Sequence, residues 1–354
     1  MDKILDIKNI LEEVVGIGAS DIFVVAGSPI IYKLKGRMIR YNDDVLKPQD
    51  TKEIISQIYD MSNRNFGVVE EKGEDDFSFS IKGAARFRAN SYKQRGSVAC
   101  SIRIVPFNIP DYKKLLIPEE VMSFAGEKNG LVLVTGASGS GKSTTLSCII
   151  DKINHSRECH IITIEDPIET LHAHEKSIVS QREVMTDTKS YLNALKSSLR
   201  QSPDVILLGE LRYYETIDIA MTAAETGHLI FSSLHTVGAS NTIDRIIDVF
   251  PPNQQHQIRT QLSMVLRAVV SQQLIPSTSG DMVAAFEIMI ATNAVKNMIR
   301  ESKIFQIDST IFSSSSEGML AMDTSILNLY KQGLITKENA LLYSRYPTIL
   351  EKKL

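Results

Sequence analysis

One stretch constrains the fold of this chain more than any other: LVLVTGASGSGKSTTL, which runs from Leu131 to Leu146. It joins an apolar, strand-like run to a helix-like run through a loop of Gly and Ser around one Lys. The loop matches the pattern G-x-x-x-x-G-K-[ST], and a strand before it and a helix after it are the context that this pattern requires. The stretch therefore predicts a β-loop-α unit with a phosphate site.

The chemistry of such a loop comes from its backbone. Glycines let N–H groups turn toward an anion, and the start of the following helix adds partial positive charge. Lys142 can reach the β- and γ-phosphates, and Ser143 can hold Mg²⁺. We expect the following residues to bind ATP: Gly136, Ala137, Ser138, Gly139, Ser140, Gly141, Lys142, Ser143 and Thr144.

The rest of the chain predicts two domains, which suits its 354 residues. After residue 129, apolar runs at 131–134, 161–164, 205–208 and 229–234 alternate with helical patterns at 142–153, 188–200 and 215–225, as in a mostly parallel sheet. Residues 253–347 are predicted to be largely helical. Short β-prone runs in 22–41 and 75–105, with helical spacing in 50–60, predict a smaller α+β domain. The proline-containing stretch 106–120 suits a connection, and we divide the chain into 1–112 and 113–354.

Composition excludes several classes of protein. A formal net charge of −3 gives no basic excess for nucleic acid. Three cysteines without a C-x-x-C motif argue against a disulfide framework or a zinc module, and favour a reducing cytoplasm. The start of the chain has Ile4, Ile7, Leu11, Val14 and Val15 at helical spacing, which predicts an amphipathic helix and not a signal peptide. No apolar run is long enough to span a membrane.

Hydrolysis would need a carboxylate near the phosphates, and two acidic stretches offer one. Glu210 follows the apolar run 205–208, although a Glu there could equally stabilise the first turn of a helix. Glu165, Asp166 and Glu169 follow the run 161–164 and could instead form a solvated acidic loop. His228 and His235 flank the run 229–234. Their spacing matches no common zinc motif, and a lone His is usually structural.

Together, GASGSGKSTTL, TIEDPIE, SLRQSPDVILLGELR, AETGHLIFSSLHT and the segment around VFPPNQQHQIRTQL resemble the secretion and type IV pilus ATPases, most closely the PilT-like retraction ATPases. The resemblance implies an N-terminal PAS-like α+β domain followed by a RecA-like P-loop ATPase domain with C-terminal helices. It implies that Glu169 lies in the Asp box, that Glu210 is the Walker B glutamate, and that His228 and His235 form the His box. Lys142 would be catalytic, and Ser143, Glu169 and Glu210 would hold Mg²⁺, partly through water.

Retraction motors are favoured within this family because the chain lacks the four-cysteine zinc insertion of assembly motors. Arg88 and Arg103 match positions that reach the nucleotide of a neighbouring subunit, although by themselves they could be strand arginines on a solvated face. Residues 294–301 resemble the output segment of retraction motors, with Lys296 in place of Arg. Tyr213 stands where the family usually has Asp.

The resemblance thus implies a hexameric ATP hydrolase that powers pilus retraction and twitching motility. Its expected partners are five further copies of the chain and an inner-membrane pilus platform protein, with a paralogous pilus ATPase as an optional further partner, and without nucleic acid or membrane insertion. It would be cytoplasmic and peripheral at the inner face of the cytoplasmic membrane. The alternatives are a pilus-assembly or secretion motor, a non-hydrolysing accessory subunit of another motor, and a RecA-like DNA translocase.

Overall fold

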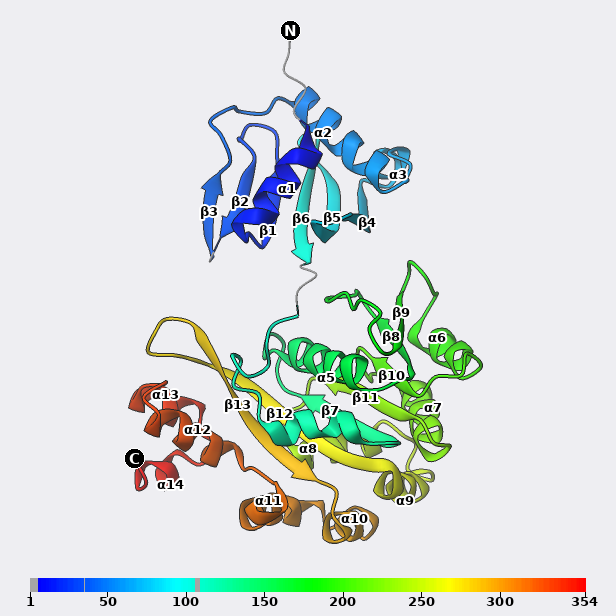
Figure 1. Ribbon diagram of the computed structural model, residues 1–354, viewed down its shortest axis with the longest axis vertical. Helices are drawn as coiled ribbons and strands as arrows, with labels where there is room; N and C mark the ends of the chain where they lie inside the picture. Colours follow the sequence, from blue (N-terminus) through cyan, green and yellow to red (C-terminus); the bar gives the residue numbers. More distant parts are fainter. Residues whose placement is uncertain (1–5, 35, 106–108) are drawn as a thin grey trace. The chain divides into compact units, whose positions relative to one another are not determined.

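The computed structural model describes residues 6–34, 36–105 and 109–354 (Figure 1). The chain forms two compact units, residues 1–108 and 109–354, so the division falls four residues before the boundary suggested by the sequence. Ile4 and the first three residues of the proposed connection, 106–108, lie outside the described residues.

The N-terminal unit is a sheet with helices on one face. The strand order is β3-β2-β1-β6-β5-β4, with antiparallel neighbours. Its elements are α1 (Ile7–Ile17), β1 (Asp21–Val24), β2 (Ile31–Leu34), β3 (Arg37–Arg40), α2 (Pro48–Met61), α3 (Gly67–Lys72), β4 (Glu74–Ile81), β5 (Ala85–Gln94) and β6 (Ser97–Val105).

Alternating residues explain why this sheet has one covered face. In β5, Ala85, Phe87 and Ala89 are buried, while Arg86 and Arg88 are only partly covered. The buried set packs with apolar residues of α1 and α2 in one core. The predicted amphipathic helix is confirmed as α1, whose N-cap is Asp6 and which ends at Gly18 with a left-handed φ of 81°.

The C-terminal unit is built on a sheet of order β13-β12-β7-β11-β10-β8-β9, in which all neighbouring strands are parallel except β12 and β13. The strands are β7 (Gly130–Thr135), β8 (His160–Glu165), β9 (Ile178–Glu183), β10 (Val205–Leu208), β11 (Leu229–Leu234), β12 (Leu266–Pro276) and β13 (Met282–Ile290).

Helices cover both faces of this sheet, which is why its central strands are continuously apolar. In β7, Val132 and Val134 pack with α4 and α5, while Leu131 and Leu133 pack toward α6 to α11. The helices are α4 (Glu119–Ser123), α5 (Lys142–Ser156), α6 (Tyr191–Ser198), α7 (Tyr214–Glu225), α8 (Ala239–Asp248), α9 (Gln255–Val265), α10 (Asn293–Arg300), α11 (Ile307–Ser313), α12 (Met322–Lys331), α13 (Lys337–Tyr343) and α14 (Pro347–Glu351).

The prediction that residues 253–347 are largely helical is wrong for β12 and β13. These strands form a long antiparallel hairpin, and β12 also pairs with β7 in parallel (Figure 1). Polar residues such as Gln272 and Gln273 interrupt the apolar pattern of β12, so pairing with β7 and β13 decides its conformation. After the hairpin, α12 to α14 pack against Ile275, Val283 and Ala285. The predicted α/β fold class with C-terminal helices is confirmed.

Helices of membrane-spanning length and apolarity are not found in the part of the chain that the structure describes.

Candidate active site

The phosphate loop connects β7 to α5, and its glycines are needed for backbone conformation and for close packing. Gly136 has a φ of 145° and Gly141 a φ of 88°. A Cβ at Gly136 would overlap the backbone carbonyl oxygen of Gln272. A Cβ at Gly141 would lie 2.7 Å from Nε2 of the Gln272 side chain. The loop is therefore packed directly against β12, which only glycine permits.

The loop leaves donors free for an anion. Helix α5 begins at Lys142 after Gly141, and no side chain caps it, so the N–H groups of its first turn are available. The hydroxyl of Ser140 is buried and has no hydrogen-bond partner among residues 6–34, 36–105 and 109–354. Ala137, Ser138 and Gly139 are exposed, as is Ser143, while Thr144 is partly covered. An orphaned buried hydroxyl beside uncapped N–H groups fits a phosphate.

Lys142 is folded back into the loop. Its Nζ donates to the carbonyl oxygens of Gly136 at 3.0 Å and Ala137 at 2.9 Å, and lies 3.4 Å from Nδ1 of His235. Burial lowers the pKa of Lys142, while the charges of Glu210 and Glu169 raise it. Its present acceptors are neutral, so a phosphate would offer the ammonium a stronger partner.

Glu210 and His235 lie at the same edge of the sheet as Lys142. Each follows a parallel strand, β10 for Glu210 and β11 for His235, and the carboxyl ends of such strands meet at one edge. The His235 Nε2 atom is 3.5 Å from Oε2 of Glu210. The imidazole ring therefore lies between Lys142 and Glu210, in reach of both.

Glu210 is also held by a neighbour that sequence reasoning did not use. Nε of Arg212 donates to Oε2 of Glu210 at 2.8 Å, and the Glu210 side chain is only 18% exposed. A carboxylate that activates water must keep an oxygen free. Arg212 and His235 both contact Oε2, so Oε1 is the oxygen that can orient water.

The acidic stretch at the end of β8 contains two carboxylates in different surroundings. Glu165 accepts a hydrogen bond from Oγ1 of Thr163 at 2.6 Å, and burial raises its pKa to about 7 against the hydrogen bonds that it accepts. Glu169 is exposed, and its charge acts on both Lys142 and Glu165. Tyr191 lies near by. Its pKa is raised mainly by burial and further by the charges of the surrounding carboxylates.

His228 does not join this group within the chain. It precedes β11, whereas His235 follows it, and six residues of strand span about 20 Å. Its Nδ1 lies 2.9 Å from the carbonyl oxygen of Ala223 at the end of α7. The two histidines of the His box that the resemblance implies therefore lie at opposite ends of β11 in this chain.

Arg88 and Arg103 face each other on β5 and β6 of the N-terminal unit. Arg88 lies 3.9 Å from Asp76, and Arg103 donates to Asp21 at 3.1 Å. Like charges directly opposite one another in a sheet repel, and these two aspartates offset that repulsion. Whether the arginines reach the nucleotide of a neighbouring subunit stays a prediction.

A family model described as "Type II/IV secretion system protein" matches residues 2–313. The chain belongs to this family. It is 44% identical over 337 residues to "Type IV pilus retractation ATPase PilT" of Pseudomonas aeruginosa, with 95% of this chain and 97% of the relative covered. It is 43% identical to "Twitching motility protein" of Neisseria gonorrhoeae, with 88% and 83% covered. The family resemblance predicted from the motifs is confirmed.

A solved structure supports the same family assignment. The crystal structure of "the Pilus Retraction Motor PilT and Bound ADP" superimposes with a TM-score of 0.90 at 47% identity, covering 98% of this chain and 99% of that one.

Motifs of the family located Lys142, Glu169, Glu210 and His235, but sequence reasoning missed Arg212 as the partner of Glu210. The signal was present, because Arg212 is two residues from Glu210 in GELR.

Proposed function

We propose that this chain is an ATP-hydrolysing motor subunit that powers retraction of a type IV pilus. The observation that carries the proposal is the line Lys142, His235 and Glu210 at the phosphate loop, with contacts of 3.4 and 3.5 Å. The names of relatives that share nearly the whole length of the chain support the choice of pilus retraction.

In this proposal Lys142 changes partners when ATP binds. Its Nζ leaves the carbonyls of Gly136 and Ala137 for the β- and γ-phosphates, which the loop N–H groups hold. A cavity of about 230 Å³ beside Gly141 and Thr144, with Leu116 and Leu274 in its wall, suits the nucleoside. Because Lys142 is buried, the local dielectric constant is low, and this strengthens the new interaction between its ammonium group and the phosphates.

Residues for Mg²⁺ lie at the same edge. The exposed hydroxyl of Ser143, with Glu169 and Glu210 partly through water, would hold the ion, which screens phosphate charge during phosphoryl transfer. Glu210 orients the attacking water through Oε1, while Arg212 and His235 contact Oε2. His235 contacts Lys142 and Glu210 together and so transmits the presence of the γ-phosphate to the loop that follows it.

Work requires an assembly of several subunits, and we propose a homohexamer in the cytoplasm at the base of the pilus. Arg88 and Arg103 would supply positive charge to the nucleotide of a neighbouring subunit, so that ATP closes an interface between subunits. The ring would act on a pilus platform protein in the inner membrane, alone or with a paralogous ATPase.

Deletion of the gene tests the direction of the motor. Loss of a retraction motor should leave cells with excess surface pili and without twitching motility, because pili still assemble but are not withdrawn. A wild-type copy should reverse both effects. A deletion strain without surface pili would show instead that the motor assembles pili.

A further inference from the structure

A buried carboxylate on the sheet has no part in the chemistry proposed above. Glu287 lies in β13 and is 5% exposed. Its Oε1 accepts a hydrogen bond from the backbone N–H of Ala239 at 2.9 Å, and its Oε2 lies 3.9 Å from Nη1 of Arg345. Burial raises the pKa of Glu287, whereas the Ala239 N–H and Arg345 lower it. A carboxylate this deeply buried is costly unless its partners are well placed.

The Ala239 N–H marks the end of the loop that carries His235. Ala239 is the first residue of α8, and residues 235–238 connect β11 to it. Gly238 lies beside the same pair, because a Cβ there would be in van der Waals contact with Arg345 Nη1 at 3.5 Å and with Glu287 Oε1 at 3.7 Å. The loop is therefore fixed by β11 at one end and by Glu287 at the other.

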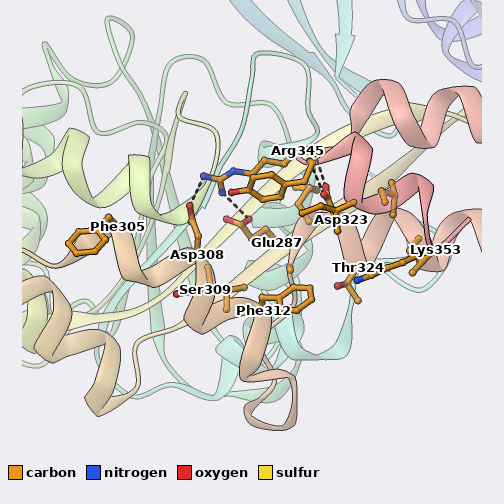
Figure 2. A pocket seen from close by; sticks show the side chains of 16 residues that line it. Glu287, Phe305, Asp308, Ser309, Phe312, Asp323, Thr324, Arg345 and Lys353 are labelled. Atoms are coloured by element: carbon orange, nitrogen blue, oxygen red, sulfur yellow. Dashed lines mark hydrogen bonds and ion pairs between the residues drawn. The ribbon is translucent and has the colours of Figure 1, made fainter.

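The C-terminal helices hold Glu287 in place (Figure 2). Arg345, between α13 and α14, points at two carboxylates and donates through Nη2 to Asp308 of α11 at 2.6 Å. Asp308 in turn accepts a hydrogen bond at 2.9 Å from Ser240, the second residue of α8. Thus three elements distant in sequence converge on the first turn of the helix that follows the His235 loop.

Two cavities meet at this point. One of about 550 Å³ lies among the C-terminal helices, and one of about 330 Å³ extends to Gly136 and Ala137 of the phosphate loop. Glu287 and Arg345 line both. The charged pair is therefore shared by the cavity at the phosphate loop and the cavity among the C-terminal helices.

We propose that Glu287 is a positioning residue for ATP hydrolysis. By accepting a hydrogen bond from the N–H of Ala239, Glu287 sets the position of His235 relative to Lys142 and Glu210. Arg345, which lies between two C-terminal helices, fixes the position of Glu287. The inference rests on the proposed role of His235. Small displacements of a group beside the reacting phosphate lower the rate far more than the binding of ATP.

Two substitutions of Glu287 test this in the full-length assembled protein. Glu287→Ala removes the acceptor and should lower kcat about tenfold or more while the dissociation constant of ATP changes less than about threefold. Glu287→Gln retains an oxygen for the Ala239 N–H and should restore kcat to within about threefold of wild type. A kcat of Glu287→Ala within twofold of wild type, or no difference between the two variants, overturns the proposal.

Asp204→Ala is the matched control. Asp204 also accepts a backbone N–H, that of His160 at 2.8 Å, but it precedes β10 and lies at the edge of the sheet away from the phosphate loop. Its loss should leave kcat within about twofold of wild type. An equal loss of kcat in Asp204→Ala would mean that any such bond matters, which contradicts a specific role for Glu287.

Ala239→Pro removes the donor at the first helical position, and the ring carbon on its nitrogen also displaces Oε1 of Glu287, which lies 2.9 Å from that nitrogen. It should lower kcat like Glu287→Ala, and the double variant should be no slower than the slower single variant, because both remove one hydrogen bond. Multiplied losses would overturn the proposal, and this variant serves if Glu287→Ala does not fold. His235→Ala tests the premise that His235 acts in hydrolysis. A normal kcat in this variant rejects the role of His235. A low kcat in this variant, together with a normal kcat in Ala239→Pro, rejects only the role of Glu287.

Discussion

The two units of the molecule present their cationic side chains in opposite ways. In the N-terminal unit, Arg88 and Arg103 are 42% and 70% exposed, and each is paired with an aspartate. In the C-terminal unit, Lys142 is buried and donates to the neutral carbonyl oxygens of Gly136 and Ala137.

This difference indicates what each site lacks. A buried ammonium bound to neutral acceptors gains a strong charge-assisted bond when phosphate arrives. Exposed ion pairs contribute about 0–1 kcal/mol, so the arginines can exchange their aspartates for another anion at little cost. In the function proposed above, Lys142 acts on the nucleotide that its own chain binds, whereas Arg88 and Arg103 act on the nucleotide of a neighbouring subunit.

The largest effect should come from Glu210→Gln, which removes charge at the C-terminal site with little change in shape. We expect kcat to fall about 100-fold or more while ATP still binds, because a positioned carboxylate acts mainly on the transition state. Steady-state ATPase assays and ATP titrations measure this. Glu215→Gln, an exposed residue at the start of α7, is the control and should retain full turnover. Turnover of Glu210→Gln within twofold of wild type would refute the assignment.

Mixed rings would distinguish residues that act on the nucleotide of their own chain from residues that act on the nucleotide of a neighbouring subunit. Arg88→Ala and Lys142→Ala should each lower turnover about tenfold or more, because each removes a cation that neutralises phosphate charge. Mixed in one ring, they should recover part of the activity, since some interfaces then combine an intact arginine with an intact phosphate loop.

The recovery must be measured over a range of mixing ratios, with mixed rings verified by native mass spectrometry. Absence of recovery at every ratio would mean that Arg88 acts within its own chain or only on structure.

Glu165 should make the stability of the C-terminal unit depend on pH. Its folded pKa of about 7 lies above the reference value of 4.5, so the unfolded chain holds fewer protons between these values. Stability from this group is therefore full below about pH 4.5 and is lost as pH rises to about 7, by ~1–3 kcal/mol.

Thermal unfolding from pH 4.5 to 8 measures this loss. In Glu165→Gln the fall in melting temperature between pH 5 and 7 should be smaller than in wild type. Asp76→Asn, on the exposed face of the N-terminal unit, should retain the wild-type slope. Parallel slopes for wild type and Glu165→Gln would show that the pKa of Glu165 is not raised.

The smallest effect on ATPase rate is expected for Lys296→Ala with Arg300→Ala in α10. Val295 and Ile299 form the buried face of this helix, whereas Arg300 is exposed and Lys296 is only partly covered, so neither cation belongs to the core. Turnover and ring mass should stay within about twofold of wild type. If the helix is the output segment, twitching motility should nevertheless be lost and surface pili should accumulate. Normal motility would make α10 an ordinary surface helix, and equal loss of ATPase would place it in the catalytic machinery.

The sequence alone determined the features that are local along the chain. The phosphate loop could be predicted because its glycines, Lys142 and the flanking apolar runs lie within 16 consecutive residues. Strands β7, β8, β10 and β11 could be predicted because each contains a run of buried, mostly apolar residues on both faces of the sheet. Glu210 and His235 could be placed at one edge because each follows such a strand.

Tertiary structure decided what depends on pairing between distant segments. Strand β12 contains Ser271, Gln272 and Gln273 and became a strand because β7 and β13 lie beside it, a contact that no local pattern encodes. The same pairing brings Gln272 against the phosphate loop and Glu287 against Ala239, 48 residues away. His228 and His235 are close in sequence, yet an extended strand separates them, because a strand of six residues carries its ends to opposite edges of the sheet.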